Sequence, residues 1–115
     1  DRKTLFVTGD GGFMMGGLAE FSSVVREQLD LVTVVCNDSA YGAEHIQFKD
    51  RQMDPALSTF DWPSFAAMSE AMGATGLRVT SDAELDAALE TVTGTKGPVL
   101  LELLLDPNAM PRMLV

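Results

Sequence analysis

The sequence has few basic residues and a single cysteine. Its 115 residues include 8 Lys and Arg against 17 Asp and Glu, which gives a formal net charge of −9. Because nucleic acids and anionic membrane surfaces attract positive charge, this balance predicts that neither is a partner. Cys36 has no second cysteine with which to form an intrachain disulfide, which favours a reducing, cytoplasmic setting.

Long apolar runs are also lacking. The two longest, residues 31–36 and 99–105, have the length of strands and fall well short of the ~20 residues of a membrane-spanning helix. We therefore expect no membrane segment. With 46% apolar residues, the chain still has enough apolar material for one globular domain. A strand pattern begins almost at Asp1, so we expect residues 1–115 to be an incomplete domain, a fragment of a larger protein.

Strand and helix patterns alternate along the chain. Strands are indicated at residues 4–8, 31–36, 76–79 and 99–105. Amphipathic helices are indicated at residues 13–28, 62–73 and 81–94. The first strand is expected to be buried, and residues 43–61 leave room for a short helix and a loop. This order predicts an α/β fold with a three-layer, mostly parallel sheet and helices on both faces.

Two of the predicted helices have recognisable starts. Asp61 or Trp62 is expected to cap a helix whose first turn contains Pro63, with the Trp62 ring anchoring that start against the core. Ser81 and Glu84 have the spacing of a capping box at the next helix.

The turn after the first strand has the sequence Gly9-Asp10-Gly11-Gly12. Ligands of parallel sheets bind beyond the carboxyl ends of the strands, and glycines there let the backbone approach a phosphate at a helix start. The dinucleotide fingerprint fails because Met14 stands in place of a glycine, and the P-loop fails because Gly17 stands in place of a lysine. No Lys or Arg occurs from Thr4 through Val25, so an anion here would need the helix dipole and a metal ion.

Two oxygen-bearing side chains suit such a metal. Asp10 lies in the glycine turn, and Asn37 follows the next strand, after an interval from Gly11 that holds one helix and one strand. Both side chains therefore reach the same edge of the sheet. Carboxylate and amide oxygens are ligands that Mg²⁺ accepts. The structural alternatives are a helix cap for Asp10 and a turn residue for Asn37.

In these residues the sequence resembles the diphosphate-binding domain of thiamine diphosphate enzymes, whose signature is Gly-Asp-Gly followed at this interval by Asn. The resemblance covers nearly the whole chain and includes residues 13–15, 37–42, 61–66, 71–74 and 97–107. It is nearest to the acetolactate synthase and benzoylformate decarboxylase group. It implies an enzyme that decarboxylates 2-oxo acids, or makes or breaks carbon–carbon bonds next to a carbonyl, with thiamine diphosphate and Mg²⁺ as cofactors.

The resemblance also implies the roles of individual residues. The metal ligands would be the Asp10 carboxylate, the Asn37 amide oxygen and the Ser39 backbone carbonyl. Backbone N–H groups of Gly11, Gly12, Tyr41 and Gly42 would contact the diphosphate. The full cofactor-binding set is Gly9, Asp10, Gly11, Gly12, Asn37, Ser39, Tyr41 and Gly42.

The same resemblance implies that no catalytic residue lies in this chain. In such enzymes the Glu that activates the cofactor belongs to a separate pyrimidine-binding domain of the partner subunit. We therefore expect a 2-oxo acid substrate, that domain and further copies of the enzyme in a homo-oligomer as partners. The 115 residues alone are expected to be inactive.

The sequence departs from the commonest family pattern at two positions. Gly12 stands where Ser or Ala is usual, a mild change for a backbone contact. Asp38 stands where a second Asn is frequent, and it would weaken diphosphate binding unless it points to solvent.

Other residues near the site have ordinary interpretations. Cys36 is interpreted as a small buried apolar residue, and Glu44 and His45 as members of an exposed helix face rather than as substrate contacts. Residues 13–15, Phe-Met-Met, are expected to leave an apolar patch uncovered near the cofactor turn.

Two alternative functions belong to other classes. One is a nucleotide-dependent oxidoreductase with Asp38 on a ribose hydroxyl, which the failed glycine fingerprint disfavours. The other is a degenerate domain kept for subunit assembly, which would be expected to have lost Asp10 or Asn37; both are present.

Overall fold

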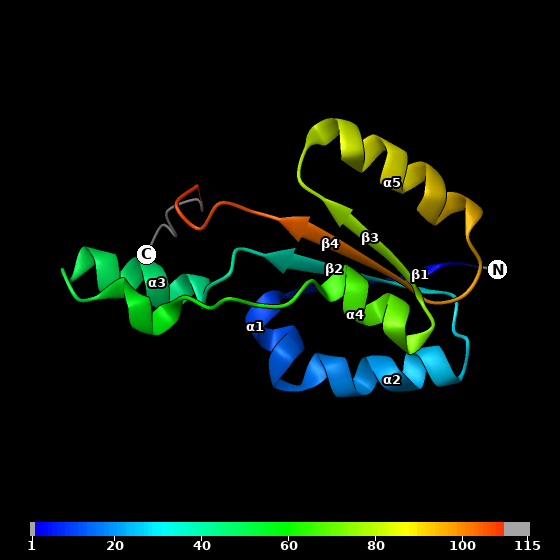
Figure 1. Ribbon diagram of the computed structural model, residues 1–115, viewed down its shortest axis with the longest axis horizontal. Helices are drawn as coiled ribbons and strands as arrows, with labels where there is room; N and C mark the ends of the chain where they lie inside the picture. Colours follow the sequence, from blue (N-terminus) through cyan, green and yellow to red (C-terminus); the bar gives the residue numbers. More distant parts are fainter. Residues whose placement is uncertain (1, 110–115) are drawn as a thin grey trace.

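Four parallel strands form the centre of the structure, a computed structural model that describes residues 2–109 (Figure 1). They are β1 (Thr4–Gly9), β2 (Leu31–Asn37), β3 (Thr75–Val79) and β4 (Val99–Leu104), in the order β1-β2-β4-β3. Every pairing in this sheet is parallel, and the register places Gly9 beside Cys36 and Asn37 beside Leu104. The carboxyl ends of β1, β2 and β4 therefore meet at one edge, as the sequence predicts.

Helical segments connect the strands. The first connection is one continuous helical stretch made of α1 (Asp10–Gly12), a π-helical turn η1 (Phe13–Gly17) and α2 (Leu18–Arg26). The others are α3 (Gly42–Asp50), a 3₁₀ turn η2 (Pro55–Ser58), α4 (Phe65–Met72) and α5 (Asp82–Gly94). None of the helices within residues 2–109 has both the length and the apolar character needed to cross a membrane.

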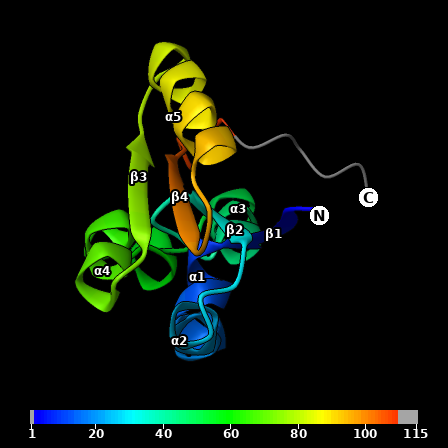
Figure 2. The ribbon, with the colours of Figure 1, turned by 90° about the vertical axis from the view of Figure 1, so that its right-hand side faces the viewer.

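The helices cover both faces of the sheet, so the predicted three-layer α/β architecture is confirmed. Figure 2 shows α5 on one side of the strands and α2 with α4 on the other. Alternation along the strands explains this division. In β4, Leu100 packs with Phe13, Phe21 and Phe65 of the α2 and α4 layer, whereas Leu101 faces α5.

Strand β1 is at the edge of the sheet, and its expected burial is wrong. Leu5 and Val7 are 65% and 58% exposed, and Phe6, on the opposite face, is 47% exposed. β2 is the only strand paired with β1 among the described residues, and no helix there covers its middle. The expected apolar patch at residues 13–15 is also wrong in part, because Phe13 is buried in the core and only Met15 is well exposed.

The start of α4 differs from the prediction, whereas the start of α5 agrees with it. Ser64 caps α4 by accepting a hydrogen bond from Ala67 N at 3.3 Å, so the proline lies before the helix rather than in its first turn. Ser64 can cap the helix because its backbone is extended and its hydroxyl oxygen accepts a hydrogen bond from a first-turn N–H group. At α5, Ser81 Oγ accepts from Glu84 N at 3.4 Å, as the capping box requires.

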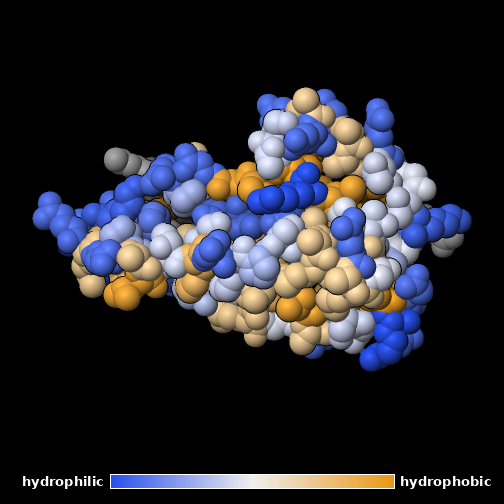
Figure 3. All heavy atoms as spheres, viewed as in Figure 1, coloured by the Kyte–Doolittle hydropathy of each residue, from blue (hydrophilic) through white to orange (hydrophobic). Residues whose placement is uncertain are grey.

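The polarity of the outer surface differs from one end of the molecule to the other. In Figure 3 the end formed by α3 mixes hydrophilic and apolar side chains, whereas apolar side chains gather over α2 and α4. These two helices carry partly buried apolar residues that pack on the core, among them Leu18, Val24, Met68 and Met72. The site described next lies between these two regions, at the carboxyl ends of β1 and β2.

Candidate functional site

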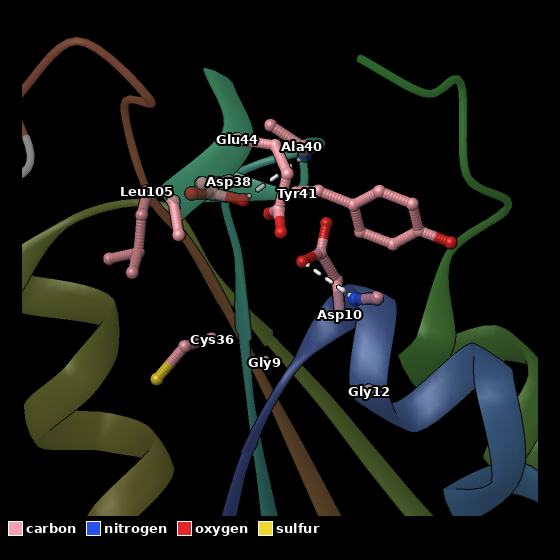
Figure 4. A pocket seen from close by; sticks show the side chains of 12 residues that line it. Gly9, Asp10, Gly12, Cys36, Asp38, Ala40, Tyr41, Glu44 and Leu105 are labelled. Atoms are coloured by element: carbon pink, nitrogen blue, oxygen red, sulfur yellow. Dashed lines mark hydrogen bonds between the residues drawn. The ribbon is translucent and has the colours of Figure 1, made fainter. Parts of the chain in front are cut away.

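A cavity of about 330 Å³ opens at the carboxyl ends of β1 and β2 (Figure 4). Three segments build most of its wall: the glycine turn after β1, the loop after β2 and the first turn of α3. The lining residues are Gly9, Asp10, Gly11, Gly12, Cys36, Asp38, Ala40, Tyr41, Gly42, Ala43, Glu44 and Leu105. Six of the eight residues predicted to bind a cofactor thus share one cavity, and Asn37 and Ser39 belong to the loop that forms its wall.

The charged residues that line the cavity are all acidic. Asp10, Asp38 and Glu44 line it, and no Lys, Arg or His does so among the described residues. Three carboxylates repel a free phosphate group and attract a cation. The charge of an anion bound here would have to be offset, by a cation or by the backbone N–H groups at the helix starts.

Asp10 is 2% exposed, and its two carboxylate oxygens have different partners. Oδ1 accepts a hydrogen bond from Gly11 N at 2.9 Å, and Oδ2 accepts one from Trp62 Nε1 at 2.9 Å. The Trp62 ring is itself fixed by stacking on Phe60, with ring centroids 4.6 Å apart. Asp10 therefore does stabilise its helix start, but each oxygen keeps a further lone pair for a metal ion.

Asn37 ends β2 and is held at both ends of its amide. Nδ2 donates to Glu102 Oε1 at 2.9 Å, and Oδ1 accepts from Ser39 N at 3.0 Å. Ser39 has a positive φ of 56°, which turns the chain sharply after the strand, and its carbonyl accepts from Phe60 N at 2.9 Å. These oxygens come from a carboxamide and a main-chain carbonyl. Carboxylate, carboxamide and main-chain carbonyl oxygens are the kinds of ligand that Mg²⁺ accepts.

Asp38 does not point to solvent, which corrects one option left open by the sequence. Its side chain is 7% exposed, and Oδ1 accepts from Ala40 N at 3.1 Å. Burial raises the pKa of the Asp38 carboxyl, and the nearby Asp10 charge raises it further. Gly42 gives this side chain its room, because a Cβ at that position would lie 2.7 Å from Asp38 Oδ2.

Gly11 is required by the ring that packs over it. A Cβ on Gly11 would lie 2.5 Å from both Cδ1 and Cε1 of Tyr41. Gly12 is less constrained, since its Cβ would lie 3.3 Å from Thr8 Oγ1. The Ser or Ala that is usual at position 12 thus needs only a small shift.

Two expected backbone donors already have acceptors within the chain. Gly11 N donates to Asp10 Oδ1, and Tyr41 N donates to Ser58 O at 2.8 Å. The first-turn N–H groups of a helix have no acceptor inside that helix. Gly12 and Gly42, in the first turns of α1 and α3, are therefore the better placed donors for an anion.

Cys36 and His45 differ from their predicted environments. Cys36 is partly exposed at the cavity, and burial followed by the charges of Asp38 and Asp10 raises the pKa of its thiol, which keeps it protonated. His45 is buried at 6% exposure and bonds through Nδ1 to Ser58 Oγ at 3.2 Å, whereas an exposed face was expected. The η2 turn covers it, which the sequence pattern did not show. Glu44 is exposed, as predicted, but it also lines the cavity.

Sequence reasoning missed the hydrogen bonds that Trp62 and Glu102 make to the two expected metal ligands. Glu102 carried a signal, because a carboxylate inside the apolar run 99–105 needs partners. Trp62 was expected only to pack, and nothing local pointed to its indole N–H. In the described part of the chain, no group of three or more His, Cys, Asp or Glu gathers in a way that could hold a metal. A metal here would depend on amide and carbonyl oxygens as well as on Asp10.

The chain is similar in sequence to known proteins. Residues 1–103 match the family model of the thiamine pyrophosphate enzymes' C-terminal TPP binding domain. The chain is 32% identical over 104 residues to the acetolactate synthase isozyme 2 large subunit of Escherichia coli, covering 87% of this chain and 18% of that protein. It is also 32% identical over 96 residues to indole-3-pyruvate decarboxylase of Azospirillum brasilense, covering 84% of this chain and 17% of that protein.

The solved structures show the same fold. Benzoylformate decarboxylase from Polynucleobacter necessarius superimposes with a TM-score of 0.81 at 21% identity, over 96% of this chain and 21% of that one. The chain thus spans about a fifth of the length of the proteins that it matches.

Proposed function

The chain belongs to the thiamine pyrophosphate enzymes, as their C-terminal cofactor-binding domain, and on that premise we propose that it anchors thiamine diphosphate (thiamine pyrophosphate) through Mg²⁺. One observation supports the proposal: Asp10 and the glycine turn line a cavity together with the segment that follows Asn37, and the charged residues of that lining are all acidic. The diphosphate of the cofactor is an anion. Such a wall can hold it only if a cation lies between them.

The donor set fits the metal. The ligands we propose are the Asp10 carboxylate, the Asn37 amide oxygen and the Ser39 backbone carbonyl, all of them hard oxygen donors that suit Mg²⁺. Each is already fixed by hydrogen bonds: Asp10 by Trp62, Asn37 by Glu102 and the Ser39 carbonyl by Phe60. A preorganised set of oxygens loses little freedom when the ion arrives.

We assign the diphosphate contacts to the two helix starts. Gly12 and Gly42 would donate their N–H groups, with Gly9, Gly11 and Tyr41 shaping the wall around the phosphates. The absence of a Cβ at Gly11 lets the Tyr41 ring close over the turn. Because Asp38 adds a buried charge to this wall, we expect the metal ion to be indispensable here.

The reaction proposed for the intact enzyme follows from the cofactor. Thiamine diphosphate, when bound, supplies an electron sink for breaking or forming a bond next to a carbonyl. We therefore propose a lyase or transferase that decarboxylates 2-oxo acids or joins their products, in the manner of the acetolactate synthases. This chain would hold and orient the cofactor, and a pyrimidine-binding domain in a homo-oligomer would complete the site. A cytoplasmic location is part of the same proposal.

The oxidoreductase alternative has little support in the structure. It needs Asp38 to reach a ribose hydroxyl, but that carboxylate accepts from Ala40 N and lies against Gly42. The assembly-domain alternative needs a damaged metal site. Asp10 and Asn37 are both present, and both are oriented by long-range hydrogen bonds.

The proposal is tested by calorimetric titration of thiamine diphosphate into the intact protein, with MgCl₂ and with EDTA. Saturable binding with MgCl₂ and its loss with EDTA are expected, with no comparable binding of NAD⁺. Tight NAD⁺ binding and no response to thiamine diphosphate would contradict the assignment. In the same preparations, CO₂ release from pyruvate and benzoylformate tests the reaction class, and residues 1–115 expressed alone are expected to release none.

A further inference from the structure

Glu102 lies in the middle of β4 with a side chain that is 1% exposed. β4 is an inner strand, and the neighbours of Glu102 across the sheet are Val35 of β2 and Arg78 of β3. A carboxylate removed from water in this way is strongly unfavourable unless hydrogen-bond donors surround it. Its partners therefore indicate why this position carries a charge within an otherwise apolar strand.

The two oxygens of Glu102 face different parts of the molecule. Oε2 accepts hydrogen bonds from Ser64 Oγ at 2.9 Å and Ala66 N at 3.1 Å, both at the start of α4. Oε1 accepts from Asn37 Nδ2 at 2.9 Å. The half-exposed Arg78 contributes only a distant contact, with Nε 3.9 Å from Oε2. Oε2 thus accepts hydrogen bonds from the start of α4, and Oε1 accepts one from a proposed metal ligand.

Two contacts select the orientation of the Asn37 amide, Glu102 Oε1 on Nδ2 and Ser39 N on Oδ1. The oxygen and the NH₂ group of an amide have nearly the same shape, so hydrogen-bond partners alone select between the two orientations. An ionised Glu102 can only accept, and it therefore requires Nδ2 on its side. Oδ1 is then turned to the opposite side, toward the Ser39 turn that carries the third proposed ligand.

We propose that Glu102 is a positioning residue that presets the Asn37 amide with its oxygen toward the metal ion. This inference rests on the proposed function, because Asn37 needs a defined orientation only if its oxygen is a ligand. Without Glu102, the flipped amide would present an NH₂ group to a cation, which is repulsive. Metal ligands commonly depend on such supporting partners.

The same stretch of chain also touches the other proposed ligand. Trp62 donates to Asp10 Oδ2, and two residues later Ser64 donates to Glu102. The entry into α4 therefore supports Asp10 directly and Asn37 through Glu102. Both proposed ligands are thus supported from one segment of the chain, residues 62–66.

Glu102→Gln is the sharpest test. In this variant Ser64 Oγ and Ala66 N still require an acceptor, so the Gln oxygen is expected to take the place of Oε2 and its NH₂ group to face Asn37. Either the contact with Asn37 is then lost or its amide flips against Ser39 N, and both outcomes disturb the proposed ligand. We expect thiamine diphosphate to bind the intact protein, at fixed MgCl₂, about 10- to 100-fold more weakly in calorimetry, with the melting temperature nearly unchanged.

A second substitution should restore the site. In Asn37→Asp/Glu102→Gln, the Gln NH₂ group can donate to one oxygen of the new carboxylate and leave the other for the metal ion. We expect the double variant to bind roughly tenfold more tightly than Glu102→Gln or Asn37→Asp alone. Asn37→Asp alone places two carboxylates in contact, so it should lose affinity although Asp is a good Mg²⁺ ligand. If Glu102→Gln alone does not fold, the comparison of the double variant with Asn37→Asp alone still tests the inference.

Glu90→Gln is the matched control, since it makes the same substitution at an exposed position of α5. It should leave both the melting temperature and the cofactor affinity unchanged. Unchanged affinity in Glu102→Gln, or full affinity in Asn37→Asp alone, would overturn the inference while the proposed function stood. A wild-type protein that binds no thiamine diphosphate with Mg²⁺ would overturn both.

Discussion

Two helices begin at the same edge of the sheet, α1 after β1 and α5 after β3, and each start has a cavity beside it. The cavity beside α5 measures about 160 Å³ and is lined by residues 79–82, Leu85 and 103–105. At α5 the polar groups bond to one another locally: Ser81 accepts from Glu84 N, and Glu84 accepts from Thr80 N at 2.6 Å. At α1, by contrast, Asp10 accepts from a residue 52 positions away.

This difference indicates what separates a helix cap from a binding site. A local capping box satisfies its own donors and stabilises the helix, with nothing left over for a ligand. At α1 the distant partners Trp62 and Glu102 orient oxygens that still have lone pairs for a cation. The predictions below contrast the two starts.

Asp10→Ala should have the largest effect on cofactor binding. It removes the only carboxylate in the proposed ligand set, and we expect the affinity for thiamine diphosphate with Mg²⁺ to fall by at least about 100-fold in calorimetry. Asp82→Ala is the matched control, since it removes the same charge from the start of α5. Equal affinities in the two variants would show that the metal is not held by Asp10.

Gly11→Ala should rank next. Its Cβ would lie 2.5 Å from the Tyr41 ring, so the ring must move into the cavity, and we expect roughly tenfold weaker cofactor binding in the same titration. Gly16→Ala, in the same helical stretch, meets nothing within 4 Å and should bind normally. It should even stabilise the helix by about 0.5–1 kcal/mol. A Gly11→Ala protein with full affinity would contradict the closure of Tyr41 over the turn.

Asp38→Asn should raise the melting temperature and the cofactor affinity, and its effect on affinity should be smaller than those of the two preceding substitutions. Because burial, and then Asp10, raises the pKa of Asp38 in the folded chain, its neutral form favours folding. That stabilisation is complete below the unfolded pKa of about 3.9 and is lost as the pH rises through the folded value. The variant should therefore melt above wild type at pH 7, and the difference should shrink as the pH falls toward about 4.

The same variant should bind the cofactor several-fold more tightly, since one repulsive charge leaves the wall. Asp86→Asn, an exposed acidic residue of α5, controls for net charge and should change neither property. A lower melting temperature in Asp38→Asn at pH 7 would mean that the ionised carboxylate is stabilised where it lies.

Ser81→Ala should have the smallest effect on cofactor binding. Loss of the cap should lower the free energy of unfolding by about 1 kcal/mol, as measured by denaturant titration, with no change in cofactor affinity. A marked loss of affinity would mean that the start of α5 belongs to the site.

The sequence predicts the features that depend on local pattern. The order of strands and helices, the parallel sheet and the joint position of the glycine turn and Asn37 follow from periodicity and from the rule that parallel strands end at one edge. The cap at Ser81 follows from residue spacing.

The remaining features depend on contacts between distant residues. Asn37 and Glu102 are 65 positions apart, and no local signal shows that they meet. β1 has the apolar pattern of a buried strand, but its exposure depends on what lies beside it in the sheet. At α4 the sequence predicts Asp61 or Trp62 as the cap, whereas the helix is capped by Ser64, whose hydroxyl also bonds to the distant Glu102.

A crystal structure of the intact protein with thiamine diphosphate and MgCl₂ tests the central claim most directly. The account predicts a metal ion bonded at about 2.0–2.1 Å to an Asp10 carboxylate oxygen, Asn37 Oδ1 and the Ser39 carbonyl, with the diphosphate on its other side. A diphosphate bound elsewhere, or one held by basic side chains with no metal between it and Asp10, would contradict it.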